Sequence, residues 1–514
     1  MPPSFPERAG LSNVCQMHAR RIRWATLIVL AGGTCLRLAL AVVTPPELAY
    51  DDHFTPIRIV AREQRLPAAN ECWQCYQPPL YYVISAGVFE TAERVAAAWG
   101  RTPADAQRIG HKALQFISVV AGSATLWMCV LVLRRACRPS AAHEALGVGV
   151  VALLPQHIYM SAMVTNDALT YLLATLTVYA ALRAHDAGWP VLHAVVTGLL
   201  AGATVLSKAY GLVTALTVLL MIGGGAILSI VRRARLPGGE HPTVPSHALR
   251  PTPSAALALL VAASAFGVWP TVRNLGWYGR LHVDNFDFFR TPMRLQPPGA
   301  ASAIDFTSFR LLDLLKYPWV HTTHVNSFWT ELYARLWFDY EGLTVTLRAA
   351  REWRAHDARV SQIHPRWTRE RWQALLNWNP RDVPPDFRRV AVMSYWAGLP
   401  LTLVPLAGLL LGLRRCGRDF GVALLLVHFV LCLAIPLFQA LRIPYFAAMK
   451  TAFALSMVSS VPVLVVLAVQ SLRAWAGRVL AMVLWLGLAL LAAANVGFVA
   501  AQYRQLTPAL GQPW

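Results

Sequence analysis

Long apolar runs alternate with short polar segments along most of the 514 residues. Many of these runs approach the length of about 20 residues that a helix needs to cross a hydrocarbon core of about 30 Å. The pattern therefore predicts an all-α polytopic membrane protein with about eleven transmembrane helices, within a range of roughly 10 to 13. We place the spans at residues 24–43, 109–133, 145–163, 169–182, a run that ends near Ser207 and Lys208, 211–230, 255–270, 390–413, 420–438, 446–469 and 479–500.

Composition supports this class, since 56% of the residues are hydrophobic and 14% are charged, against roughly a quarter charged in soluble domains. The mean hydropathy is +0.44. A net charge of +20 would suggest a nucleic-acid partner, but arginine clusters lie beside the ends of apolar runs, where they orient spans. We therefore expect no nucleic-acid partner and a cytoplasmic N-terminus. The clusters include Arg20, Arg21 and Arg23, Arg134, Arg135 and Arg138, Arg232, Arg233 and Arg235, and Arg414, Arg415 and Arg418.

The first long polar segment, residues 45–108, is rich in acid, cysteine and proline for so apolar a chain. Asp51, Asp52 and His53 lie near its start, and the pattern over 54–63 predicts a short amphipathic helix in the membrane interface. Paired carboxylates suit proton transfer, although either one could instead cap the helix that follows. We interpret the segment as a catalytic loop on the extracytoplasmic face.

Of the eight cysteines, only Cys72 and Cys75 fall in a predicted outer loop. We expect a local disulfide there, given an oxidising compartment. Free thiols or half of a zinc site are the alternatives, although the sequence has no second pair at ligand spacing. The following Pro78 and Pro79 exclude a continuous helix, and they predict a rigid turn beneath the carboxylates.

Further polar residues at the ends of spans should share the outer face with the acidic pair. Carboxylates with scattered cations at a membrane surface suit a substrate with a lipid tail and a phosphate head, because the cations would hold the phosphate. Each residue also has a simpler role, such as capping a helix, snorkelling to the interface or touching lipid headgroups. Lys450 lies within an apolar run, so we expect it to face the protein interior or the site. The candidate substrate-binding residues are His53, Gln77, Tyr81, Asn166, Asp167, Lys208, Arg273, Arg442 and Tyr445.

We divide the chain into three parts. Residues 1–275 would form the catalytic transmembrane module, and 390–514 would form the C-terminal transmembrane helices. Between them, 276–389 has no apolar run long enough to cross and is rich in tryptophan, which favours the membrane–water boundary. We expect this middle part to be a helical extracytoplasmic subdomain that rests on the lipid headgroups.

The order of these motifs resembles that of the GT-C superfamily of membrane glycosyltransferases, which includes protein O-mannosyltransferases and the lipid A aminoarabinose transferase. The resemblance rests on an acidic pair after the first span, a QPPLYY sequence before the second, and polar pairs after later spans. These pairs are Asn166 with Asp167, Ser207 with Lys208, and Arg273 with Asn274, followed by Tyr278 and Gly279.

The resemblance implies transfer of a sugar from a polyprenyl-phosphate donor to an acceptor hydroxyl, usually with inversion, outside a bacterial inner membrane. One of Asp51 and Asp52 would be the general base. Asp52 replaces the glutamate common in this motif and His53 follows directly, so the identity of the base stays open. No cofactor is certain, but these three residues leave room for a divalent metal, which some members need. The pair Cys72 and Cys75 indicates a divergent branch.

Two other classes of function compete with this hypothesis. A transporter or flippase of a lipid-linked sugar would have charged sites near the bilayer midplane, between paired broken helices. A non-catalytic membrane assembly subunit would tolerate asparagine at Asp51 and Asp52.

Overall fold

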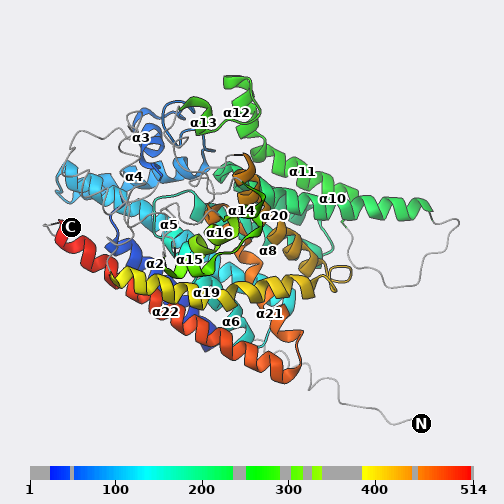
Figure 1. The fold of residues 1–514 in the computed structure, drawn as a ribbon. Coiled ribbons are helices and arrows are strands. Elements are labelled where there is room, and N and C mark those ends of the chain that lie inside the picture. Colours follow the sequence, from blue (N-terminus) through cyan, green and yellow to red (C-terminus); the bar gives the residue numbers. More distant parts are fainter. Residues whose placement is uncertain are drawn as a thin grey trace, which may run out of the picture.

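The computed structural model describes residues 23–46, 51–235, 251–289, 302–316, 327–338, 385–442 and 450–510. Over these ranges the chain is helical and contains no strand. The helices pack as one bundle, in which α19 (Pro385–Gly412) and α22 (Ala474–Leu510) lie side by side along one edge (Figure 1). The prediction of an all-α polytopic membrane protein is confirmed.

Six helices of the described part are long and apolar enough to cross a membrane, or up to eight spans if two bent pairs are each counted as one. The prediction of about eleven spans is higher because it counted three shorter or more polar runs, which fold as α6 (Ala141–Ala152), α8 (Asp167–Asp186) and α9 (Val191–Ser207). The six long helices are α2 (Trp24–Val43), α5 (Pro103–Cys137), α10 (Leu212–Arg235), α19, α20 (Phe420–Arg442) and α22.

Three of the predicted spans are broken rather than continuous. At each break a proline lies in the first turn of the second helix, where its missing N–H would be unsatisfied in any case. The second and third pairs below bend by 45° and 62°. The pairs are α6 with α7 (Pro155–Met160), α11 (Pro253–Gly267) with α12 (Trp269–Tyr278), and the 3-10 helix η7 (Thr451–Ser459) with α21 (Val461–Gln470).

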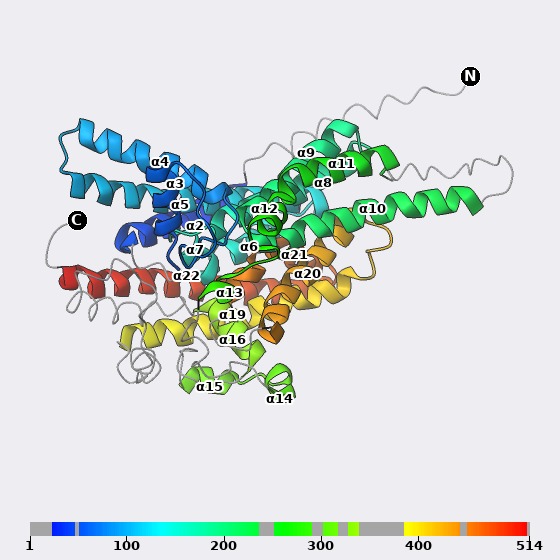
Figure 2. The same ribbon diagram turned by 90° about the horizontal axis from the view of Figure 1, so that it is seen from above.

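The predicted outer loop, 45–108, is mostly helical. The expected amphipathic helix is α3 (Phe54–Glu63), and α4 (Leu80–Ala98) is a longer helix that the sequence reasoning did not predict. α4 packs along the first part of α5, and the two form a hairpin that extends from the bundle (Figure 2). The two prolines therefore end the preceding turn and start α4.

The middle part, 276–389, is described only in pieces, which include short helices; one of them, α16 (Phe328–Trp337), is largely buried and packs against α7, η7 and α19. Its boundaries with the flanking parts stay a prediction. Trp319, Trp353, Trp367, Trp372 and Trp378 lie outside the described residues. The other short helices described here are α13 (Asn285–Phe288), α14 (Ala303–Thr307) and α15 (Leu311–Lys316).

Small residues let the helices of the bundle approach closely. α9 presents Gly198 and Gly202 to α11, and a Cβ added at Gly202 would lie 2.6 Å from the carbonyl oxygen of Ala263. Close backbone approach is how helices associate where lipid removes the hydrophobic driving force. This contact holds the end of α9 beside α11, which is followed by α12, the helix that carries Arg273.

Candidate active site

The two neighbouring aspartates have different partners. Asp52 caps α3, since its Oδ1 accepts the backbone N–H groups of Phe54 and Thr55 at 3.0 and 3.1 Å. Its Oδ2 accepts the Thr55 hydroxyl at 2.6 Å. Asp51 instead accepts a hydrogen bond from Lys450 Nζ on its Oδ2 at 3.1 Å. Of the pair, Asp51 is the carboxylate that the helix leaves available for chemistry.

The ion pair of Asp51 and Lys450 joins segments 399 residues apart. Lys450 directly precedes η7 and is 7% exposed, while the Asp51 side chain is 24% exposed. Burial alone would raise the pKa of Asp51, but the charge and hydrogen bond of Lys450, together with the charge of Lys208, outweigh it and hold that pKa below its ordinary value. Asp51 is therefore ionised at neutral pH.

A second buried ion pair lies where α8 begins and α9 ends. Lys208 Nζ donates to Oδ2 of Asp167 at 2.7 Å, and the Thr165 hydroxyl donates to the same oxygen at 2.6 Å. The Tyr210 hydroxyl, on the 3-10 turn η2 (Ala209–Gly211), donates to Oδ1 of Asp167. The Tyr171 hydroxyl donates to the same Oδ1 at 3.4 Å, so four donors surround Asp167 and it keeps its charge in a buried position.

Asn166, next to this pair, ties the same two helices together. Its side-chain amide donates to the carbonyl oxygen of Ser207 at 3.3 Å. Its Oδ1 is buried and has no hydrogen-bond partner within the described residues. Asn166 therefore has one free acceptor beside the charged cluster.

His53 is buried, and the charges of both ion pairs act on it. Its Nδ1 is 3.1 Å from the hydroxyl of Tyr82. Burial, assisted by the charge of Lys208, lowers the pKa of His53 to about 4, so the ring is neutral at pH 7. Because Lys208 perturbs both Asp51 and His53, the two ion pairs belong to one electrostatic cluster.

Arg273 holds the loop between α3 and α4. Its Nη2 donates to the carbonyl oxygen of Tyr76 at 2.7 Å and its Nη1 to that of Gln77 at 3.4 Å. The guanidinium carbon lies 5.3 and 6.0 Å from the ring centres of Trp269 and Trp277. The side chain predicted to contact phosphate is thus placed to brace this loop.

The other predicted residues lie at the margin of the cluster. Gln77 is buried and donates from Nε2 to the Tyr76 hydroxyl at 2.7 Å, and Tyr81 is buried in the apolar core beneath α3 and α4. Arg442, whose side chain is 41% exposed, forms an ion pair with Asp284 at 2.9 Å. Tyr445 lies outside the described residues.

Sequence reasoning missed Tyr76, Tyr210 and Asp284 as neighbours of the charged groups. Tyr210 had a signal, because it lies two residues after Lys208 at the same helix end. Asp284 had none, because its pairing with Arg442 joins two distant segments.

The residues around Asp51 do not fit a metal site as they are arranged. Within the ranges that the structure describes, no group of three or more His, Cys, Asp or Glu side chains is placed to hold a metal ion. Both oxygens of Asp52 serve α3, Asp51 pairs with an ammonium, and Nδ1 of His53 faces Tyr82.

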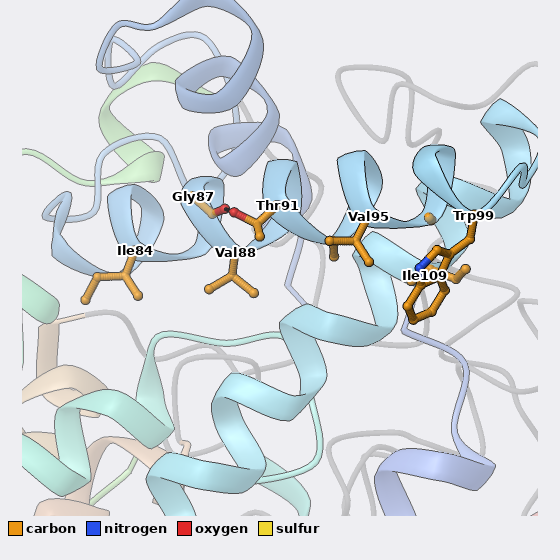
Figure 3. Close-up of a pocket in the computed structure, with 9 residues that line it drawn as sticks. Ile84, Gly87, Val88, Thr91, Val95, Trp99 and Ile109 are labelled. Atoms are coloured by element: carbon orange, nitrogen blue, oxygen red, sulfur yellow. Dashed lines mark hydrogen bonds between the residues drawn. The ribbon is translucent and has the colours of Figure 1, made fainter.

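An apolar groove of about 650 Å³ runs between α4 and α5. Figure 3 shows Ile84 and Val88 on one side of α4 and Trp99 beside Ile109 at the far end. Tyr82, which contacts His53, lies in the first turn of α4. An apolar surface thus leads away from the charged cluster, as a lipid-contacting face of a membrane protein would.

No protein-family model matches the chain, and neither does any curated protein sequence. Solved structures similar to it include the Archaeoglobus fulgidus oligosaccharyltransferase in complex with Zn and sulfate (14% identity, 92% of this chain and 53% of that chain, TM-score 0.43). They also include AglB from the same organism with an inhibitory peptide and a dolichol-phosphate (14%, 93% and 56%, 0.45). A third is ArnT from Cupriavidus metallidurans bound to undecaprenyl phosphate (14%, 86% and 77%, 0.32).

These neighbours are membrane glycosyltransferases of the GT-C superfamily, the group that the sequence motifs resemble. The chain spans about half the length of the oligosaccharyltransferase that it matches, 53% and 56% in the two structures. With identities near 14% and TM-scores below 0.5, the likeness carries no argument about activity. The functional conclusion depends on the site itself.

Proposed function

We propose that this protein is an integral membrane glycosyltransferase that moves a sugar from a polyprenyl-phosphate donor to an acceptor hydroxyl, with inversion. The observation that carries the proposal is the pairing of two carboxylates, Asp51 and the buried Asp167, with two buried ammonium groups in one cluster. Asp51 and Lys450 are 3.1 Å apart, and Asp167 and Lys208 are 2.7 Å apart. The cluster therefore combines a group that accepts a proton with groups that bind phosphate.

Asp51 is the general base in this proposal, because Asp52 uses its oxygens to cap α3. The acceptor oxygen attacks the anomeric carbon from the side opposite the phosphate and forms the new glycosidic bond. The bond between that carbon and the phosphate oxygen breaks, and the polyprenyl phosphate leaves with the electron pair. The acceptor's proton passes to Asp51. The attack from the opposite side inverts the anomeric centre.

Lys450 would couple donor binding to the strength of the base. Its charge helps to keep the pKa of Asp51 low. A donor phosphate that draws the ammonium toward itself would weaken this effect, so that Asp51 becomes a better proton acceptor once the donor is bound. The same ammonium would stabilise the negative charge that develops on the leaving phosphate.

Lys208 would be the second phosphate ligand, since Thr165 and Tyr210 hold its partner carboxylate, Asp167, in place. Arg442 pairs with Asp284 and is partly exposed, which suits a headgroup contact at the rim. Arg273 would act indirectly through the loop that it braces. The lipid tail of the donor would remain in the bilayer, beside the apolar side of α4.

Turnover tests the proposal. Purified protein in lipid nanodiscs would be incubated with a panel of radiolabelled polyprenyl-phosphate sugars and candidate hydroxyl acceptors, with and without a chelator. We expect acceptor-dependent release of polyprenyl phosphate with at least one donor. Binding of the donors without release under any of these conditions would contradict the assignment as a transferase. Cysteine labelling from either side of oriented vesicles would test the proposed extracytoplasmic position of the site and cytoplasmic N-terminus.

A flippase of a lipid-linked sugar is the second candidate. Two site cations lie on the bent helix pairs, Arg273 in α12 and Lys450 at the start of η7. Broken helices that line a substrate site are typical of secondary transporters. Proteoliposomes that move a labelled lipid-linked sugar between leaflets, without cleavage of the sugar–phosphate bond, would favour this candidate over the transferase.

A further inference from the structure

The loop between α3 and α4, residues 64–79, contains a feature that the proposed chemistry does not use. A disulfide joins Cys72 to Cys75, and both residues are buried. The Cys75 N–H donates to the carbonyl oxygen of Cys72 at 3.1 Å, and the Gln77 N–H donates to that of Gln74 at 3.1 Å. We call residues 72–77 the cystine turn. It directly precedes the two prolines that start α4.

The cystine turn is fastened to the surrounding helices. Arg273 donates to the carbonyl oxygen of Tyr76 at 2.7 Å, and the Trp73 ring lies 5.8 Å from that of Phe286. The Tyr82 hydroxyl donates weakly to the carbonyl oxygen of Gln74 at 3.4 Å. The same hydroxyl is 3.1 Å from Nδ1 of His53, which follows the two aspartates. One phenol therefore connects the turn to the catalytic segment.

Tyr76 is part of this turn, and its hydroxyl proton is available for a hydrogen bond. Its hydroxyl oxygen accepts from Nε2 of Gln77 at 2.7 Å, and no described residue accepts its proton. Burial raises its pKa well above the ordinary value, with Asp51 and Asp284 adding to the effect and Lys450 opposing it. The phenol is therefore neutral, and the charges of Asp51, Asp284 and Lys450 act on it.

We propose that the Cys72–Cys75 disulfide is a positioning device, which holds the cystine turn so that the Tyr76 hydroxyl donates a hydrogen bond to the donor phosphate. This inference rests on the proposed function, since it names a contact of that site. A disulfide stabilises the folded state less as the loop that it closes becomes shorter. A bridge between positions three apart therefore acts mainly on local geometry. The oxygen of the Tyr76 hydroxyl already accepts a hydrogen bond from Gln77, so its proton is left to donate. The charged oxygens of a phosphate are strong acceptors for such a proton.

The direct contact is tested by Tyr76→Phe, which removes one oxygen and keeps the ring. The measurement is the Kd of undecaprenyl phosphate, taken by native mass spectrometry or by fluorescence in detergent micelles. We expect binding about tenfold weaker, the effect of one lost hydrogen bond to a charged group. Tyr179→Phe, in α8 and outside the cluster, is the matched control and should bind as the wild type does. Unchanged binding by Tyr76→Phe would overturn the contact.

The positioning role is tested by the double variant Cys72→Ala/Cys75→Ala, with Cys35→Ala, an exposed free cysteine, as control. We expect the double variant to lose about tenfold in affinity, and we expect no further loss when Tyr76→Phe is added. If the disulfide only stabilised the fold, the affinity losses of the cysteine double variant and of Tyr76→Phe would multiply when the variants are combined. Hydrogen exchange gives a second readout: amides of the cystine turn should exchange faster in the double variant and not in Tyr76→Phe.

These measurements separate this inference from the proposed function, because binding does not require turnover. Wild-type protein that binds undecaprenyl phosphate but transfers no sugar would contradict the transferase and leave the Tyr76 contact supported. Wild-type protein that does not bind undecaprenyl phosphate would overturn the phosphate contact. Affinity in Cys72→Ala/Cys75→Ala equal to that of the wild type would overturn the positioning role.

Discussion

Asparagine substitution should reduce turnover strongly at Asp51 and only slightly at the neighbouring Asp52. Asp51→Asn keeps the shape of the side chain and removes the charge that faces Lys450 at 3.1 Å. Asp52→Asn makes the same chemical change one residue later, where the side chain caps α3. The two variants thus control for each other in position, volume and chemistry.

For Asp51→Asn, the attraction lost across 3.1 Å is about 5 kcal/mol at an effective dielectric constant of about 20. Desolvation of both groups offsets part of it, and the Asp51 side chain is 24% exposed. We therefore expect the free energy of unfolding to fall by about 2–3 kcal/mol, near the lower end for a broken buried pair. Turnover should fall by about 10²- to 10⁴-fold, the usual contribution of a general base.

For Asp52→Asn, the amide oxygen still accepts from the N–H groups of Phe54 and Thr55. The loss is mainly the negative charge at the N-terminus of α3, worth about 0.3–1 kcal/mol. Turnover should stay within a few-fold of the wild type.

The assay is release of radiolabelled sugar to acceptor, with thermal unfolding measured on the same samples. Equal loss of turnover in the two variants would refute the assignment of Asp51 alone as the base. Full turnover in both variants would refute a catalytic role for the acidic pair.

Three further predictions concern packing, pH and the second ion pair. Gly202→Ala should lower the free energy of unfolding by about 1–3 kcal/mol through overpacking. The control is Gly223→Ala, which should change the free energy of unfolding little because no heavy atom lies within 4 Å of the new Cβ. Equal effects of the two substitutions in a thermal melt would refute the close contact between α9 and α11. Because His53 is buried with its pKa lowered to about 4, the unfolded chain binds more protons below pH 6.5, so stability should fall by up to about 3 kcal/mol between pH 6.5 and 4. This loss should be smaller in His53→Gln, and identical pH slopes in chemical denaturation would contradict it. A double-mutant cycle of Asp167→Asn and Lys208→Met should give a coupling energy of about 1–3 kcal/mol in unfolding experiments, whereas additive effects would show that the pair contributes nothing.

The acidic segment shows what the local sequence pattern could predict and what it could not. The sequence placed Asp51 and Asp52 together before an amphipathic helix, and α3 is where the pattern predicts it. It could not distinguish their roles, because either residue is close enough to cap the helix. The choice depends on Lys450, which approaches from a segment 399 residues away.

Lys450 and Arg273 illustrate two other limits. A lysine in an apolar run could be assigned to the interior from the cost of its charge in lipid, but the identity of its partner could not. Arg273 had the charge and position expected of a phosphate ligand, yet its donors reach the carbonyl oxygens of Tyr76 and Gln77. Charge is a property of the residue, whereas the bonds that it makes depend on what packs against it.

The sequence by itself determined the class of this protein and the course of most of its helices. A bilayer leaves backbone N–H and C=O groups no partner except within a helix, so each apolar run of sufficient length has one outcome. Only the tertiary structure decided which helices break, which carboxylate is free, and which cations face it. Those outcomes depend on contacts such as Asp51 with Lys450 and Gly202 with Ala263, which join distant segments and leave no trace in local spacing.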